Sequence, residues 1–142
     1  MQLRHLDAWT DERRKLAFRY NELLKPVVRV PEEGKGEFCV YQTYMVWAGR
    51  RDELKTYLNQ NGVQAAVHYP TPIPLQPAAK KLGYRSADFP VTMKLASGIL
   101  SLPLYPGMTR RQQDRVAALI KEFYVSRSFN TIRGGSKGRD ER

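Results

Sequence analysis

Apolar residues recur every three or four positions in three long stretches of the chain, each with a charged opposite side. Residues 2–24 and 52–61 both show this period, which predicts amphipathic helices, the second of them capped by Asp52. A further helix is expected after Thr109, because Thr109 and Gln112 form a capping box in which each side chain reaches the other's backbone amide. The buried side of this helix is predicted to comprise Val116, Leu119, Ile120 and Phe123.

Between these helices the pattern changes to short runs of β-branched, aromatic and aliphatic residues. The run that most strongly favours a strand is 37–47, EFCVYQTYMVW. Three other runs favour strands at 27–30, 63–67 and 99–105, and a short helix is expected at 91–98. The resulting order is helix, strand, strand, helix, strand, helix, strand, helix. It predicts an α+β fold in which helices cover a small sheet.

Length and charge narrow this picture. The 142 residues suffice for one domain with its own core, which we place at residues 1–125. Residues 126–142 lack an apolar period and are expected to form a disordered basic tail. The formal net charge of +10 favours an anionic partner. Because the cations are spread in pairs along predicted helices, without an aromatic and basic stripe, nucleic acid is disfavoured as that partner.

Several classes of protein are disfavoured by what the sequence lacks. No apolar run approaches the roughly 20 residues that a membrane span requires, and the charged N-terminal stretch has no signal-peptide core. Cys39 is the only cysteine, so an internal disulfide is excluded and a cytoplasmic location is expected. His5, His68 and Cys39 are far apart in sequence, so no metal-ligand spacing occurs. No glycine-rich phosphate loop lies between a predicted strand and helix.

The most unusual local chemistry lies in residues 67–84, VHYPTPIPLQPAAKKLGY. Its three alternating prolines fix the backbone in extended conformations, so the loop is ordered at a small entropic cost. A preset loop of this kind can hold His68 and Tyr69 toward a ligand. The alternative is a proline-rich bend that packs both rings on the core, and composition alone favours that alternative.

The order of the motifs along the chain changes this balance. The relevant stretches are LRHLDAWTDERRKLAFRYNELL, FCVYQTYMVWAGRRDELKTYLNQNGV, VHYPTPIPLQPAAKKLGY and DFPVTMKLASGILSLPLYPGMTRRQQDRVAALIKEF. Within them, the succession HYP-x-P, Q-P-A, FP and LSLP-x-YP-x-MT closely resembles the C-terminal part of the DegT–StrS family of sugar aminotransferases. The resemblance runs from about Leu3 to Phe123, nearly the whole predicted domain.

The resemblance implies a fold-type-I enzyme that depends on pyridoxal phosphate, is usually a homodimer, and transfers an amino group to a nucleotide-linked keto sugar, commonly from glutamate. In that family a large N-terminal domain carries the cofactor and its Schiff-base lysine, and this chain resembles the smaller C-terminal domain. None of its lysines lies in the family's cofactor-lysine context. Because pyridoxal chemistry needs that amine, we expect no transamination by the chain alone and assign it no catalytic, cofactor-binding or metal-binding residue.

The resemblance also implies a substrate-side role for a few residues. His68 and Tyr69 match the family's His-Tyr-Pro stretch, which lies toward the active-site cleft, and Gln42 matches the strand before it. Gln76 fits the same order of motifs. Pro74 stands where many members have a histidine, which removes a polar contact for the sugar. A truncated or separately encoded domain that pairs with a large-domain chain, a non-catalytic remnant or regulatory binder, and a basic nucleic-acid-binding protein remain as alternatives, in decreasing order.

Overall fold

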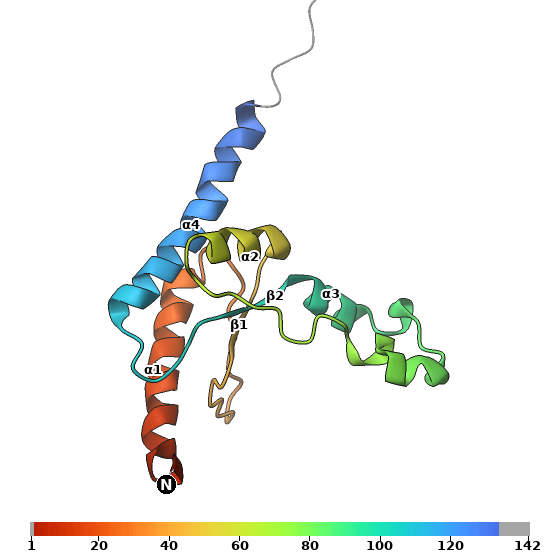
Figure 1. Cartoon of the computed structure of the whole chain (residues 1–142), viewed down its shortest axis with the longest axis horizontal. Coiled ribbons are helices and arrows are strands. Elements are labelled where there is room, and N and C mark those ends of the chain that lie inside the picture. The colour runs from red at the N-terminus through yellow and green to blue at the C-terminus, as the bar shows by residue number, and fades with distance from the viewer. Residues whose placement is uncertain (1, 134–142) are drawn as a thin grey trace, which may run out of the picture.

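The computed structural model describes residues 2–133, with side chains described over 3–125, and its elements alternate between helices and two short strands (Figure 1). The α-helices are α1 (Leu6–Leu24), α2 (Arg51–Gln60), α3 (Pro90–Gly98) and α4 (Arg110–Arg133). Short 3-10 helices lie at η1 (Gln2–His5), η2 (Ile73–Leu75), η3 (Pro77–Leu82) and η4 (Ser86–Asp88). The strands are β1 (Tyr44–Trp47) and β2 (Ile99–Leu102). The predicted α+β class, a small sheet with helices around it, is confirmed.

The two strands pair antiparallel, and each has a further segment on its outer edge. Backbone pairing joins Tyr44 to Leu102, Met45 to Ser101, Val46 to Leu100 and Trp47 to Ile99. Arg29 bridges to Trp47 on one edge, and Ala66 bridges to Ser101 on the other. The runs predicted as strands at 27–30 and 63–67 therefore lie beside the sheet, but each contributes a single bridge and no strand of its own.

The strand predicted at 37–47 is too long, since only Tyr44–Trp47 pairs. Tyr41 has a φ of 47°, in the left-handed region, which ends an extended strand. The preceding loop is held by α1 instead: the Arg14 guanidinium donates to both carboxylate oxygens of Glu33 at 2.7 and 2.9 Å and to the carbonyl of Cys39 at 2.6 Å. It also lies over the Phe38 ring, 4.0 Å from the centroid. These side-chain contacts replace sheet pairing.

The core lies where α1 and α2 pack against α4 and the sheet. The Tyr20 and Tyr44 rings are fully buried with centroids 5.0 Å apart, and burial raises the pKa of both phenols. The Tyr20 hydroxyl donates to the carbonyl of Pro103 at 3.1 Å, which ties α1 to the segment after β2. Val116, Ile120 and Phe123 of the predicted stripe are buried and Leu119 packs against them partly exposed.

The two predicted helix caps have different outcomes. In α4 the Thr109 amide donates to Gln112 Oε1 at 2.8 Å and the Gln112 amide donates to Thr109 Oγ1 at 3.3 Å, which confirms the capping box. The prediction that Asp52 caps α2 is wrong. Arg50, with a φ of 57°, occupies the capping position, and Asp52 lies in the first turn, 2.7 Å from Arg51 Nε.

At the other end, α4 continues through Ser126, where we expected the disordered tail to begin, as far as Arg133. Extending an existing helix needs no new nucleus, so a few polar residues can continue it without an apolar face. The rest of the predicted tail, 134–142, lies outside the described residues. Within 2–133 no helix is both long enough and apolar enough to cross a membrane.

Between residues 69 and 98 the chain forms an arm, made of η2, η3, η4 and α3, that projects from the rest of the molecule (Figure 1). The base of the arm is α3, whose contacts with the body are mainly to β1. The Trp47 indole N–H donates to the carbonyl of Lys94 at 3.0 Å. The Arg51 guanidinium donates to the carbonyl of Ile99 at 3.0 Å, just beyond the helix.

Candidate functional site

A cavity of about 390 Å³ lies beside the end of β2, where the chain leaves the sheet. Its polar lining comes from three separate segments: the loop before β1, the segment that bridges to β2, and β2 with the residues after it. The polar side chains are Gln42, Thr43, Gln64, His68, Ser101 and Tyr105. We call it the His68 cavity. No lysine, arginine or carboxylate is among the described residues that line it.

Sheet pairing positions the histidine. Ala66 and Ser101 exchange two backbone hydrogen bonds of 3.1 and 2.8 Å, which aligns residues 66–68 with β2. His68 Nδ1 then lies 2.7 Å from Ser101 Oγ, and the ring tautomer decides which of the two donates. Ser101 is 5% exposed, so this hydroxyl is a fixed partner that orients the imidazole. The other ring nitrogen remains for a ligand.

The donors and acceptors of this cavity suit a neutral polar ligand. An amide such as Gln42 or Gln64 both donates and accepts, and the Thr43 and Tyr105 hydroxyls do the same. Sugar hydroxyls are likewise both donors and acceptors. The arrangement can therefore bind and orient a polyhydroxylated group, but it supplies no amine for a Schiff base and no cluster of carboxylates for acid–base chemistry.

The structure brings together two of the four residues that sequence predicts for substrate binding. Gln42 and His68 both line the cavity. Tyr69 follows His68 but is 82% exposed, with a φ of 58°, and does not line it. Gln76 lies further along the arm, where its side-chain amide donates to the carbonyl of Thr71 at 3.2 Å.

Four lining residues were missed from sequence: Thr43, Gln64, Ser101 and Tyr105. Ser101 and Tyr105 stand within the LSLP-x-YP motif, so that motif could have pointed to them. Thr43 follows Gln42 directly. Gln64 has no such signal, because only the bridge between Ala66 and Ser101 brings its segment to the cavity.

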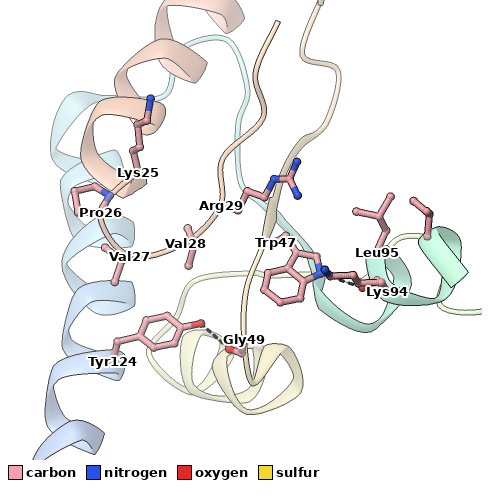
Figure 2. A pocket seen from close by; sticks show the side chains of 11 residues that line it. Lys25, Pro26, Val27, Val28, Arg29, Trp47, Gly49, Lys94, Leu95 and Tyr124 are labelled. Carbon is pink, nitrogen blue, oxygen red and sulfur yellow. Dashed lines mark hydrogen bonds between the residues drawn. The ribbon is translucent and has the colours of Figure 1, made fainter.

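A second cavity, of about 840 Å³, shares no residue with the first (Figure 2). It lies between the C-terminal end of α1, the edge of β1, α3 and α4, and contains none of the predicted site residues. Across the described chain, no group of three or more histidine, cysteine or acidic side chains is placed to hold a metal ion.

A small antiparallel sheet, its helices and a neutral polar cavity define an α+β ligand-binding module without a complete catalytic centre of its own. The chain belongs to the DegT/DnrJ/EryC1/StrS aminotransferase family, whose model matches residues 1–121. The resemblance seen in the sequence motifs is confirmed.

Two curated relatives and two solved structures illustrate the likeness. A Geobacillus stearothermophilus protein named pleiotropic regulatory protein is 40% identical over 84% of this chain and 33% of its own length. The dTDP-3-amino-3,4,6-trideoxy-alpha-D-glucose transaminase of Streptomyces venezuelae is 32% identical over 87% of this chain and 33% of its length. Among solved structures, S. venezuelae DesV in complex with a ketimine intermediate has a TM-score of 0.81 and is 32% identical, covering 86% of this chain and 33% of that one. Bacillus subtilis NtdA with bound cofactor PMP has a TM-score of 0.67 at 30% identity, over 83% and 28% of the two chains.

The chain thus spans about a third of the length of the relatives that it matches. The family is one of aminotransferases, and the cofactor form in the NtdA structure agrees with the pyridoxal chemistry that the motifs implied.

Proposed function

We propose that residues 1–125 serve as the C-terminal, small domain of a pyridoxal-phosphate-dependent sugar aminotransferase. The complete enzyme would transfer an amino group, commonly from glutamate, to a nucleotide-linked keto sugar. The family match over residues 1–121 and the sugar transaminases among the relatives support this assignment. The free, exposed Cys39 agrees with a cytoplasmic enzyme, and we expect a homodimer.

The observation that carries the substrate side of the proposal is the 2.7 Å hydrogen bond between His68 and buried Ser101. It fixes an imidazole at the wall of a neutral cavity, with Gln42 beside it. These side chains would hold the sugar by its hydroxyls and so orient it. They neither form nor break bonds in this role.

The His68 cavity does not fit pyridoxal phosphate. That cofactor needs an amine for its Schiff base and cationic or amide donors around its phosphate, whereas no described residue that lines the cavity is a lysine or arginine. The cofactor must therefore be held by another part of the enzyme. When bound there, it supplies the electron sink for amino transfer.

A chimera tests the substrate role. Residues 1–125 would replace the matching third of the S. venezuelae transaminase, and turnover of its keto sugar nucleotide would be followed at varied substrate concentration. Loss of a neutral hydrogen bond of about 1 kcal/mol predicts a KM about fivefold higher for His68→Ala and Gln42→Ala. Gln76→Ala is the matched control and should leave KM unchanged. A folded chimera in which Gln76→Ala raises KM and His68→Ala does not would overturn the assignment of the cavity.

The 142-residue chain by itself tests the need for a second part. With pyridoxal phosphate, glutamate and a keto sugar nucleotide, we expect no aminated sugar by mass spectrometry. Turnover by this chain alone would refute the proposal.

A non-catalytic regulatory module is the second candidate, favoured by the name of the G. stearothermophilus relative. Under this alternative, the chimera folds and binds the sugar nucleotide but gives no turnover, even with all large-domain catalytic residues present.

A further inference from the structure

The second cavity has a cationic and aromatic lining that the proposed sugar-binding role does not use (Figure 2). Its positively charged residues are Lys25, Arg29 and Lys94, and no carboxylate is among the described residues that line it. Glu32 is the nearby acid, but its oxygen is 4.0 Å from Lys25 Nζ and both side chains are largely exposed. An ion pair with that separation and exposure leaves most of the positive potential in place.

Trp47 provides a rigid aromatic wall. Its indole N–H donates to the carbonyl of Lys94 at 3.0 Å, which fixes the ring against the base of α3 (Figure 2). Gly98 packs directly against the same ring, so closely that a Cβ there would be 2.7 Å from Trp47 Cδ1 and would overlap two other indole atoms. The ring is thus held without covering the cavity, and its remaining surface can contact a ligand.

Arg29 is held beside this ring by backbone pairing. Arg29 and Trp47 exchange hydrogen bonds of 3.1 and 2.9 Å, and directly paired residues of antiparallel segments project their side chains to the same face. Figure 2 shows the guanidinium next to the indole. Across residues 3–125 no carboxylate pairs with Arg29 or with the Lys94 ammonium, so both are available to an anion.

The opposite wall is the side of α3 that carries Val91, Lys94 and Leu95, at helical positions i, i+3 and i+4. Val91 is 70% exposed and Leu95 is 44% exposed, although both border the cavity. Two apolar side chains therefore face open space beside a cation. A ligand with an apolar body would bury them, and its charge would meet Lys94.

From these walls we propose that this cavity binds an organic anion: a phosphate monoester or carboxylate carried on a flat, aromatic body. The body would lie between Trp47 and the apolar side of α3, and the anionic group would contact Arg29 and Lys94. At about 840 Å³ the cavity is within the size range of small-molecule sites.

The test is a titration of the full 142-residue chain with phenyl phosphate and, separately, with inorganic phosphate, followed by NMR. The chain has two tryptophans, Trp9 and Trp47, so their indole N–H signals provide a reporter and an internal reference, assigned with Trp9→Phe. We expect phenyl phosphate to shift the Trp47 signal saturably while the Trp9 signal stays still. Because inorganic phosphate lacks the body that would bury apolar surface, its affinity should be at least about fivefold lower.

Substitutions separate a specific site from general attraction by a basic chain. Loss of a charge-assisted hydrogen bond predicts an affinity about tenfold lower for Arg29→Ala and for Lys94→Ala. Lys35→Ala removes the same charge from an exposed loop outside the cavity and should change affinity less than twofold. Equal loss in all three variants, equal affinity for both probes, or no saturable shift of Trp47 would each overturn the proposal.

Discussion

Replacing Gly98 by alanine tests how the arm is fastened to the body. Gly98 is the last residue of α3, is buried, and its carbonyl accepts a hydrogen bond of 2.9 Å from the Ala48 amide. An alanine Cβ would overlap the Trp47 indole at Nε1 and Cε2. Neither group can yield freely, since the indole N–H is bonded to the carbonyl of Lys94 and the backbone of residue 98 is bonded to β1.

The magnitude follows from two losses. Overpacking a fixed ring costs about 1–3 kcal/mol. Displacing the ring also breaks the hydrogen bond from Trp47 to Lys94, which is worth about 1 kcal/mol. We therefore expect Gly98→Ala to lower the free energy of unfolding by about 2–4 kcal/mol, a large part of the roughly 5–15 kcal/mol typical of a domain.

Urea unfolding followed by circular dichroism measures this loss. Gly49→Ala is the matched control, because a Cβ at Gly49 would meet nothing within 4 Å and its φ is not positive. That control should change stability by less than about 0.5 kcal/mol. In a Trp47→Ala background the clash is absent, so Gly98→Ala should lose most of its effect. A Gly98→Ala chain as stable as the Gly49→Ala chain, or an equal loss with and without Trp47, would refute the reasoning.

Other parts of the molecule give further expectations. Thr109→Ala removes a capping hydrogen bond of α4 and should lower the free energy of unfolding by about 1 kcal/mol in urea; an unchanged midpoint would show that the cap is not needed. The hydrogen bonds from Arg14 hold the pKa of Glu33 below its ordinary value of 4.5, so their stabilising effect is complete above about pH 4.5 and is lost as pH falls through the lowered folded-state pKa. NMR titration of this carboxyl should show its pKa return toward 4.5 in Arg14→Ala, and an unmoved pKa would exclude that cause. Leu3 and Leu6 are 83% and 47% exposed at the start of the chain, so we expect self-association that glutamate at both positions reduces; light scattering that finds only monomer in the unmodified chain would contradict this.

The sequence determines the helices well because their signals are local. The apolar period of 2–24 anticipated η1 and α1, and the Thr109–Gln112 box set the start of α4 within one residue. A period of three to four residues and a cap depend only on neighbours in the chain, so they can be recognised without knowing the fold. The end of α4 was placed too early, because polar residues that continue a helix leave no period to detect.

The strands were less predictable, because a strand exists only through its partner. Residues 37–43 have the composition of a strand, yet Arg14, far away in sequence, holds Glu33 and Cys39 and lies over Phe38 instead. The runs at 27–30 and 63–67 each form a single bridge for the same reason: pairing partners, and not composition, decide how far a ladder extends.

What the sequence alone determined is therefore the class of fold, the helices and, through the order of its motifs, the family. It also singled out Gln42 and His68, but it could not join them, since they lie in different loops of the chain. Only the tertiary structure decided that they share a cavity: the bridge between Ala66 and Ser101 carries His68 to a buried hydroxyl, while Tyr69 and Gln76 stay outside. Contacts between distant segments depend on packing of the whole chain, and no local pattern records them.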